Sequence, residues 1–423
     1  MQGVAERQTA GGMAHTLDHR PHVEMENIVR GVVSSLPAWL IFQVVFLGSC
    51  VLMAISCIVV TATSFDALSV LLCGNSWGLQ LTPRVAFVAS CPEGAWQCAG
   101  AGAFAGVEAE AGTLISLGYV LTVAITAPLA LVEVSEPFQF ASYALSLACL
   151  LFLIAKFSLI AAQGAHLAVS GLATGGSHLV DGVDDQRQLP PVWKWDPGLA
   201  LEVSFYSWTI SFAVPMWLDE LSPEVHMEGS LLASFAHRAL LDLALGLSGA
   251  AAFPHMPPNG LNVLQTVGVH PQCGLLTQMA GIVFVISSLA TSIVDYAMVA
   301  VRNLEAHTGD KVASLAGVAL PFMTGWLFYF GKSFANLLNI AAPLLNGSIQ
   351  FMVPGALFYA YSRLDRATPS YAVLGVDVPA VAIRALALSM VFGTAVLIAA
   401  TYALPTLAET PKADYAADYT AGR

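Results

Sequence analysis

Long apolar segments with few charged residues recur along most of this chain, and they limit its possible folds more than any other feature. An apolar run of about 18 or more residues is long enough to cross a bilayer as a helix. The predicted spans are 36–62, 112–133, 138–163, 199–218, 231–253, 277–301, 312–331, 336–361 and 380–404. Because backbone polar groups must be satisfied inside lipid, we expect an all-α, multi-pass membrane protein with about nine visible spans.

Composition supports this class. Charged residues make up 10% of the chain, whereas soluble globular proteins carry about 25%. The formal net charge of −12 argues against nucleic-acid binding, which needs a basic surface. Residues 1–35 and 405–423 are polar and are predicted to be tails, the first of them disordered, so that 36–404 forms the transmembrane domain.

The loops between the predicted spans differ in their basic residues. Loops 302–311 and 362–379 contain Lys or Arg, whereas 254–272 contains neither. The positive-inside rule therefore places the first two in the cytosol and the third on the other side. No address signal is readable, so the plasma membrane and a vacuolar or lysosomal membrane both remain open.

One predicted span, 199–218, has a polar middle. It holds Tyr206, Ser207, Trp208, Thr209, Ser211 and, about one turn later, Pro215. On a regular helix Thr209 points away from Ser207 and Ser211, so all three can reach one ligand only if the helix unwinds. An unwound helix offers free N–H and C=O groups to a small substrate. The structural alternative is a kinked helix whose hydroxyls bond back to the preceding turn.

A second hydroxyl cluster lies in the predicted span 277–301 and consists of Ser287, Ser288, Thr291 and Ser292. The last three are spaced i, i+3 and i+4, so they share one helix face. Such a stripe can line a cation site, or it can serve close helix packing. Asp295 follows one turn later. An acid inside a span suggests a function, but Arg302 is near enough to pair with it at the membrane surface.

No catalytic Ser/His/Asp grouping, phosphate-binding glycine loop or aspartate-rich metal motif occurs in the sequence. We therefore expect neither an enzyme activity nor a metal or organic cofactor. Cys50, Cys57 and Cys149 lie in apolar runs and are predicted to pack as small hydrophobic residues. Cys91 and Cys98 would form a disulfide if their loop faced an oxidising compartment.

Several short motifs occur in an order that resembles the amino acid/auxin permease family, especially its fungal and protist members. The motifs are Phe212–Glu220 with Pro223, similar to a P-x-W-x-x-E region; Leu245–Pro254 with Pro258, Asn259 and Leu264, similar to a glycine-rich helix and N-x-L loop; Arg302-Asn303-Leu304, similar to R-x-N-L; and Ser135–Gln139. The resemblance covers roughly residues 110–405.

This resemblance implies eleven helices in the inverted-repeat fold of the amino acid–polyamine–organocation superfamily. It implies secondary active transport of an amino acid, coupled to H⁺ or Na⁺, by a monomer in a lipid bilayer. Ser207 to Ser211 then correspond to the unwound part of the sixth helix. Ser287, Ser288, Thr291 and Ser292 fall on the eighth helix, which in that fold helps to form a cation site.

The sequence departs from this family in its first part. The family's first helix is broken and glycine-rich, but residues 1–35 are polar and 36–62 lacks that glycine pattern. Asp295 stands where the family usually has a proline. Two interpretations follow: an amino acid transporter, or a truncated or non-transporting permease-like protein such as a receptor or pseudo-transporter.

Overall fold

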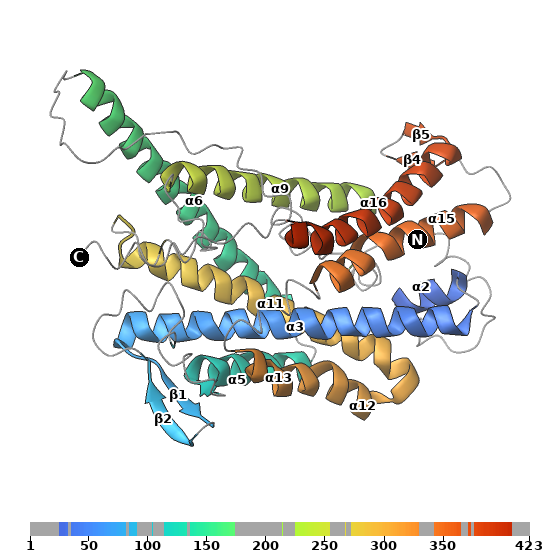
Figure 1. Cartoon of the computed structure of the whole chain (residues 1–423), viewed down its shortest axis with the longest axis horizontal. Helices are drawn as coiled ribbons and strands as arrows, with labels where there is room; N and C mark the ends of the chain where they lie inside the picture. Colours follow the sequence, from blue (N-terminus) through green and yellow to red (C-terminus); the bar gives the residue numbers. More distant parts are fainter. Residues whose placement is uncertain are drawn as a thin grey trace. The chain divides into compact units, whose positions relative to one another are not determined.

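The structure is a computed structural model of the chain. It describes residues 25–32, 35–81, 84–90, 104, 114–132, 136–173, 214, 225–253, 267, 272–329, 342–364, 371–373 and 376–407. These residues are mostly helical, with two small antiparallel sheets (Figure 1). The chain divides into two compact units, which are Met1–Ser49, Asp196–Pro215 and Leu337–Arg423 for unit 1, and Cys50–Trp195 and Met216–Asn336 for unit 2.

Six of the described helices are long and apolar enough to cross a membrane. They are Leu36–Cys73, Pro137–Gly164, Met227–Ala252, Leu275–Glu305, Asp310–Phe328 and Ala380–Ala399. Each overlaps a span predicted from the sequence. The prediction of a mostly helical chain with several helices suited to span a membrane is therefore confirmed.

The other three predicted spans come out differently. Within 112–133, the first residues form strand β3 (Leu114–Ser116), and helix α5 (Leu117–Val132) has only 16 residues. At 1.5 Å per residue α5 is about 24 Å long, less than the hydrocarbon thickness of about 30 Å. The prediction 336–361 overlaps two short π-helices and an α-helix instead of one regular helix. The prediction 199–218 lies outside the described residues apart from Val214.

Helix α3 (Leu36–Cys73) starts in unit 1 and continues into unit 2. The elements of unit 2 that follow are β1 (Trp77–Gln80), β2 (Ala86–Ala89), β3, α5, α6 (Glu136–Ala173), α9 (Met227–Ala252), α11 (Leu275–Thr308), α12 (Asp310–Ser314), η2 (Leu315–Ala319), α13 (Leu320–Thr324) and η3 (Gly325–Phe328). Those of unit 1 are α2 (Met25–Val32), η4 (Ala342–Asn346), η5 (Ser348–Met352), α15 (Val353–Leu364), β4 (Tyr371–Val373), β5 (Val376–Val378) and α16 (Ala380–Leu407).

Helix α3 runs eleven residues past the predicted end at residue 62. Two of its polar residues there bond within the helix, since the hydroxyls of Thr63 and Ser64 donate to the Val60 carbonyl at 2.9 and 2.7 Å. The helix ends where Gly74 adopts a φ of 79°, with its N–H donating to the Val70 carbonyl. A glycine in the left-handed conformation is a common helix terminator, and Gly74 is the first glycine after residue 62.

The predicted basic loop 302–311 is almost entirely helical. Helix α11 continues to Thr308, and a single residue, Gly309 with a φ of 76°, separates it from α12. The returning segment packs closely on α11, because a Cβ on Gly317 would lie 2.9 Å from the Val301 nitrogen. The loop prediction was wrong because the charged residues of 302–311 continue the helix beyond its apolar part.

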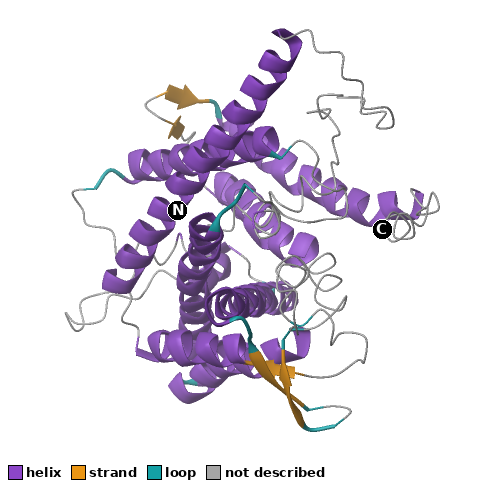
Figure 2. Ribbon diagram, turned by 90° about the vertical axis from the view of Figure 1, so that its left-hand side faces the viewer, coloured by secondary structure: helices purple, strands orange, loops and turns teal. Residues whose placement is uncertain are grey.

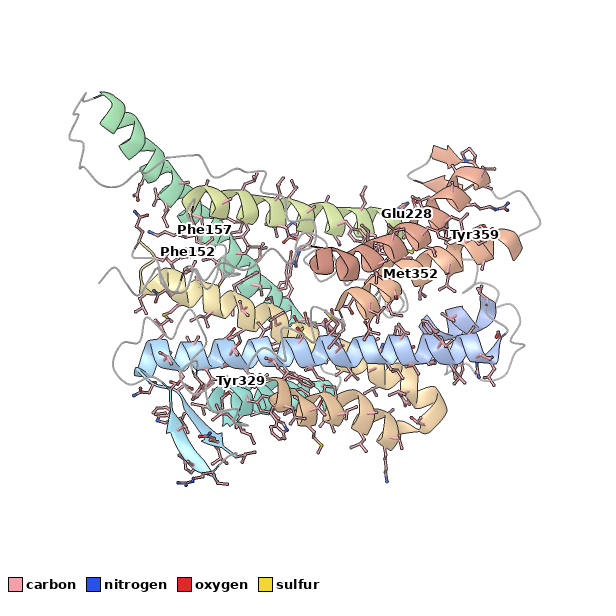
Figure 3. All side chains as sticks on the ribbon, in the orientation of Figure 1. Phe152, Phe157, Glu228, Tyr329, Met352 and Tyr359 are labelled. Carbon is pink, nitrogen blue, oxygen red and sulfur yellow. The ribbon has the colours of Figure 1, made fainter. Side chains whose placement is uncertain are left out.

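One hydrophobic core cluster of unit 2 lies where α6, α9 and the start of α11 meet. Its buried members are Leu153, Phe157, Ile160, Ala252, Phe253, Val267 and Cys273. The rings of Phe157, which is labelled in Figure 3, and Phe253 meet edge to face with centroids 5.2 Å apart. Burial raises the pKa of the Cys273 thiol, although the nearby Lys156 lowers it in part. The thiol therefore packs as a small hydrophobic group.

The free cysteines of the predicted spans that the structure describes also pack among other residues. Cys50 and Cys57 are buried on α3, and Cys149 is half-buried on α6. Cys91 and Cys98, which the sequence suggests as a conditional disulfide, lie outside the described residues.

Unit 1 holds together through α15 and α16. A Cβ on Gly355 would lie 2.9 Å from the Ala387 carbonyl oxygen, so these two helices approach closely. Arg384 of α16 donates to the Ser362 carbonyl at 2.7 Å near the end of α15. A cation at a helix C-terminus is favourable, because it satisfies carbonyls that have no partner within the helix.

In unit 2, helix α5 packs against α3 through Gly118. A methyl group at this position would overlap the Ala62 carbonyl oxygen and lie 2.7 Å from the Asp66 side chain. Both neighbours are held within α3, so neither can move aside alone. Only glycine allows this approach.

We predict that Gly118→Ala destabilises the protein by about 2 kcal/mol or more, because overpacking a close backbone contact forces helices apart. Gly164→Ala on α6 is the matched control. No atom lies within 4 Å of its added methyl group, and alanine favours a helix by about 0.5–1 kcal/mol. Thermal unfolding in detergent should show a lower Tm for the first variant and no loss for the second. Equal Tm values would contradict the contact.

Candidate functional site

The substrate residues predicted from the sequence are Tyr206, Ser207, Trp208, Thr209, Ser211 and Pro215. All six lie outside the described residues, so their role stays a prediction.

The predicted cation residues lie on α11 in unit 2. The hydroxyls of Ser287, Ser288, Thr291 and Ser292 donate to the carbonyls of Val283 (2.7 Å), Val285 (3.2 Å), Ser288 (2.9 Å) and Ser288 (3.2 Å), respectively. Their protons are thus engaged within the helix, as expected for hydroxyls in an apolar segment. Each oxygen keeps lone pairs that can accept a hydrogen bond or contact a cation.

Two polar pairs join α11 to α6, and we call their four residues the α6–α11 seam. Gln139 Nε2 donates to Asp295 Oδ1 at 2.8 Å, and the hydroxyl oxygens of Ser146 and Ser287 lie 2.8 Å apart. Ser146 and Ser287 are both buried. Of the predicted hydroxyls, Ser287 is therefore the one that bonds to a side chain of another helix among the described residues.

The structure gives Asp295 a partner that the sequence did not suggest, because Arg302 was the neighbour considered there. The sequence nevertheless contains a pattern that indicates a polar face on α6. Gln139, Ser142 and Ser146 are spaced i, i+3 and i+7, which places them on one helix face. Ser142 is buried as well. Since the Gln139 amide is neutral, its hydrogen bond orients the carboxylate without cancelling its charge.

Helix α3 brings a further polar group close to this region. Cys57 lies near enough to Asp295 to experience its charge. Thr61 follows one turn later on the same face, and its hydroxyl is fully buried with no hydrogen-bond partner in the described part of the chain. A buried unsatisfied hydroxyl costs about 1–3 kcal/mol. A bound water molecule or ion is a common explanation for a buried polar group without a partner.

A second acidic site lies in unit 2 about one and a half turns further along α3 than Thr61. Asp66 is fully buried. Its Oδ1 accepts hydrogen bonds from the Ser76 hydroxyl at 2.6 Å and the Gly118 N–H at 2.9 Å, and its Oδ2 accepts one from the Tyr329 hydroxyl. Because Gly118 is the second residue of α5, the carboxylate also satisfies a free N–H at the positive end of that helix.

The surroundings of Asp66 are equally well bonded. The Tyr119 N–H donates to Ser116 Oγ at 3.0 Å, and the Tyr119 hydroxyl donates to the Phe322 carbonyl. The ring of Phe104 lies edge-on to Tyr329, which Figure 3 labels, with centroids 6.5 Å apart. This Asp66 cluster joins α3, the sheet, α5 and the segment after η3. Its arrangement is that of a structural anchor.

Among the residues that the structure describes, no group of three or more His, Cys, Asp or Glu could hold a metal ion. Comparison with known proteins gives no match, because no protein-family model, no curated protein and no solved structure is similar to this chain. The resemblance to the amino acid/auxin permeases therefore stays a prediction from sequence motifs.

We predict that Tyr329→Phe lowers the free energy of unfolding by about 1–3 kcal/mol, because it removes one buried donor to Asp66. The matched control is Tyr143→Phe. The Tyr143 hydroxyl bonds to His237 Nε2 at 2.9 Å, but in an exposed position. We expect this control to change stability by less than about 0.5 kcal/mol. Denaturant titrations in detergent would measure both, and similar losses would contradict an anchoring role for Tyr329.

Proposed function

We propose that this protein is a secondary active transporter of amino acids that uses H⁺ or Na⁺ as the coupling ion, and that Asp295, at one end of the α6–α11 seam, binds this ion. The observation that carries the proposal is that two polar pairs connect two helices suited to span a membrane. Ionisable groups inside spans are costly and commonly mark the paths of ions or substrates. Helices that only pack together need small residues, not a carboxylate.

The chemistry around Asp295 suits a small monovalent cation. Asp295 supplies a negative charge, and the hydroxyl oxygens of Thr291 and Ser292, which lie one turn before it on α11, supply neutral ligands. Hard cations prefer oxygen ligands of this kind. A proton would instead need only the carboxylate. Mutation can therefore distinguish the two ions. Removing a hydroxyl oxygen should impair transport driven by Na⁺ and should leave transport driven by H⁺ nearly unchanged.

The substrate class rests on the sequence. An opened helix around Ser207 to Ser211, followed by Pro215, would present N–H groups to a carboxylate and C=O groups to an ammonium. An amino acid carries both groups. The motif order that resembles amino acid permeases supports the same substrate class.

One observation favours the alternative of a permease-like protein that does not transport. The hydroxyls of Ser288, Thr291 and Ser292 donate only to carbonyls of their own helix among the described bonds. A helix pair that retained its polar contacts for packing would show the same pattern. Transport measurements on purified protein separate this alternative from the proposal.

We predict that Asp295→Asn reduces ion-driven uptake at least tenfold in proteoliposomes supplied with a mixture of radiolabelled amino acids. Asparagine still offers an oxygen to Gln139, so the variant removes the charge and preserves the shape. Asp310→Asn is the control, because Asp310 is an exposed acid at the first residue of α12. Uptake by the wild type under a Na⁺ gradient, a proton gradient or neither identifies the ion.

Ser292→Ala should also reduce uptake if Na⁺ is the ion, and should leave it nearly unchanged if H⁺ is. Wild-type uptake together with unaltered uptake by Asp295→Asn would exclude Asp295 as the ion site. No uptake by any protein, including wild type, would favour the non-transporting alternative.

We further predict that Ser211→Val combined with Pro215→Ala abolishes uptake without reducing the amount of protein in the membrane. The valine removes a hydroxyl, and the alanine allows a regular helix to form where the opening is expected. Surface biotinylation alongside uptake would measure both effects. Full uptake by this double variant would contradict the assignment of 206–215 as the substrate site.

A further inference from the structure

The three-stranded sheet of unit 2 has one apolar face turned outwards. Its strand order is β2-β1-β3, and both neighbours of β1 are antiparallel to it. Leu79 is paired with Phe87 and Ile115, and residues paired across antiparallel strands have side chains on the same face. The outer sheet face therefore consists of Trp77, Leu79, Phe87, Ala89 and Ile115.

The opposite face packs against the rest of the unit. Gly78, Leu114 and Ser116 lie on it, and all three are buried. The outer face is open by comparison, because Phe87 is 88% exposed and Trp77 is 49% exposed. Val85, just before β2, is 74% exposed. Large apolar side chains gathered on one exposed face indicate a binding surface.

The sheet is attached directly to apolar helices at both ends. Strand β1 begins four residues after the last residue of α3, and β3 passes into α5 without a connecting loop. Figures 1 and 2 show β1 and β2 projecting from this end of α3. Helix α5 continues with exposed apolar side chains, among them Val120 and Ile125. The outer sheet face is thus continuous with helices whose apolar surface suits lipid.

The length of α3 places the sheet at a membrane surface. Trp39 lies near the start of α3 beneath the Arg30 guanidinium, whose carbon is 5.0 Å from the ring centroid. Tryptophan and arginine are typical of the boundary between lipid and water. Helix α3 has 38 residues and is about 57 Å long at 1.5 Å per residue. A bilayer with its headgroup layers is about 40–45 Å thick, so a helix of this length that spans the membrane reaches its surface, and the sheet begins four residues after the last residue of α3.

We propose that the outer sheet face rests in this boundary, with Trp77 and Phe87 inserted among the lipid headgroups and the first part of the acyl chains. Aromatic side chains favour this depth. Arg84, which is exposed in the turn between β1 and β2, then lies where it can contact lipid phosphates. The proposal needs only a membrane-embedded chain and does not depend on transport.

A fluorescent label tests the proposal. Single cysteines at Phe87 and Ala89, in a chain whose native cysteines are replaced, would carry the dye NBD, and Val88→Cys on the inner face is the matched control. Ala89→Cys changes little in size and guards against a failure of Phe87→Cys to fold. The proteins would be reconstituted into phosphatidylcholine/phosphatidylglycerol vesicles containing lipids with a spin label at carbon 5.

We expect the spin-labelled lipid to quench NBD at positions 87 and 89 at least twofold more than at position 88, with little quenching by iodide in the water. Strong iodide quenching at 87 and 89 would overturn the proposal in favour of a face open to water. Protection from both quenchers would also overturn it. In that case self-quenching that rises with protein density would indicate a second copy of the chain, and its absence would indicate cover by another segment of the same chain.

Discussion

The buried carboxylate of Asp66 is the interaction on which one end of unit 2 depends. Ser76, Gly118 and Tyr329 come from the start of the sheet, from α5 and from the segment after η3, and all three donate to it. A buried charge without donors is strongly unfavourable, and so are buried donors without an acceptor. These parts of the fold therefore stabilise one another, and the close approach of Gly118 to α3 is what lets the N–H of α5 reach the carboxylate.

The two acids, Asp66 and Asp295, illustrate how surroundings separate structural from functional roles. Asp66 is fully buried and accepts hydrogen bonds from Ser76, Gly118 and Tyr329, which come from three different parts of the fold, so its acceptor capacity serves the fold. Asp295 is half-buried on α11, oriented by the neutral amide of Gln139 and one turn after the hydroxyls of Thr291 and Ser292. Two carboxylates in one protein commonly take different roles when their environments differ in this way. Asp295 is for this reason the better site for a coupling ion.

The sequence predicted the parts of the fold that depend on composition alone. A long apolar run suffices to predict a membrane helix, because lipid requires only apolar side chains and internal hydrogen bonding. It could not predict the burial of Asp66 on α3 or the bond from Gln139 to Asp295. The first depends on partners of Asp66 as distant as Tyr329, and the second depends on how α6 and α11 align. The sequence contains no local pattern that would predict how α6 and α11 align or that a sheet forms between α3 and α5.

The sheet relates the Asp66 cluster to the membrane. Its inner face, with Gly78 and Ser116 buried, covers the polar groups that meet at Asp66, while its outer face carries Trp77 and Phe87. If lipid covers the outer face, the sheet separates the cluster from water as well as from the hydrocarbon. Hydrogen bonds in such a low-dielectric position are stronger, and leaving one unmade is more costly. A small sheet at the end of two apolar helices thus strengthens the anchor that holds those helices together.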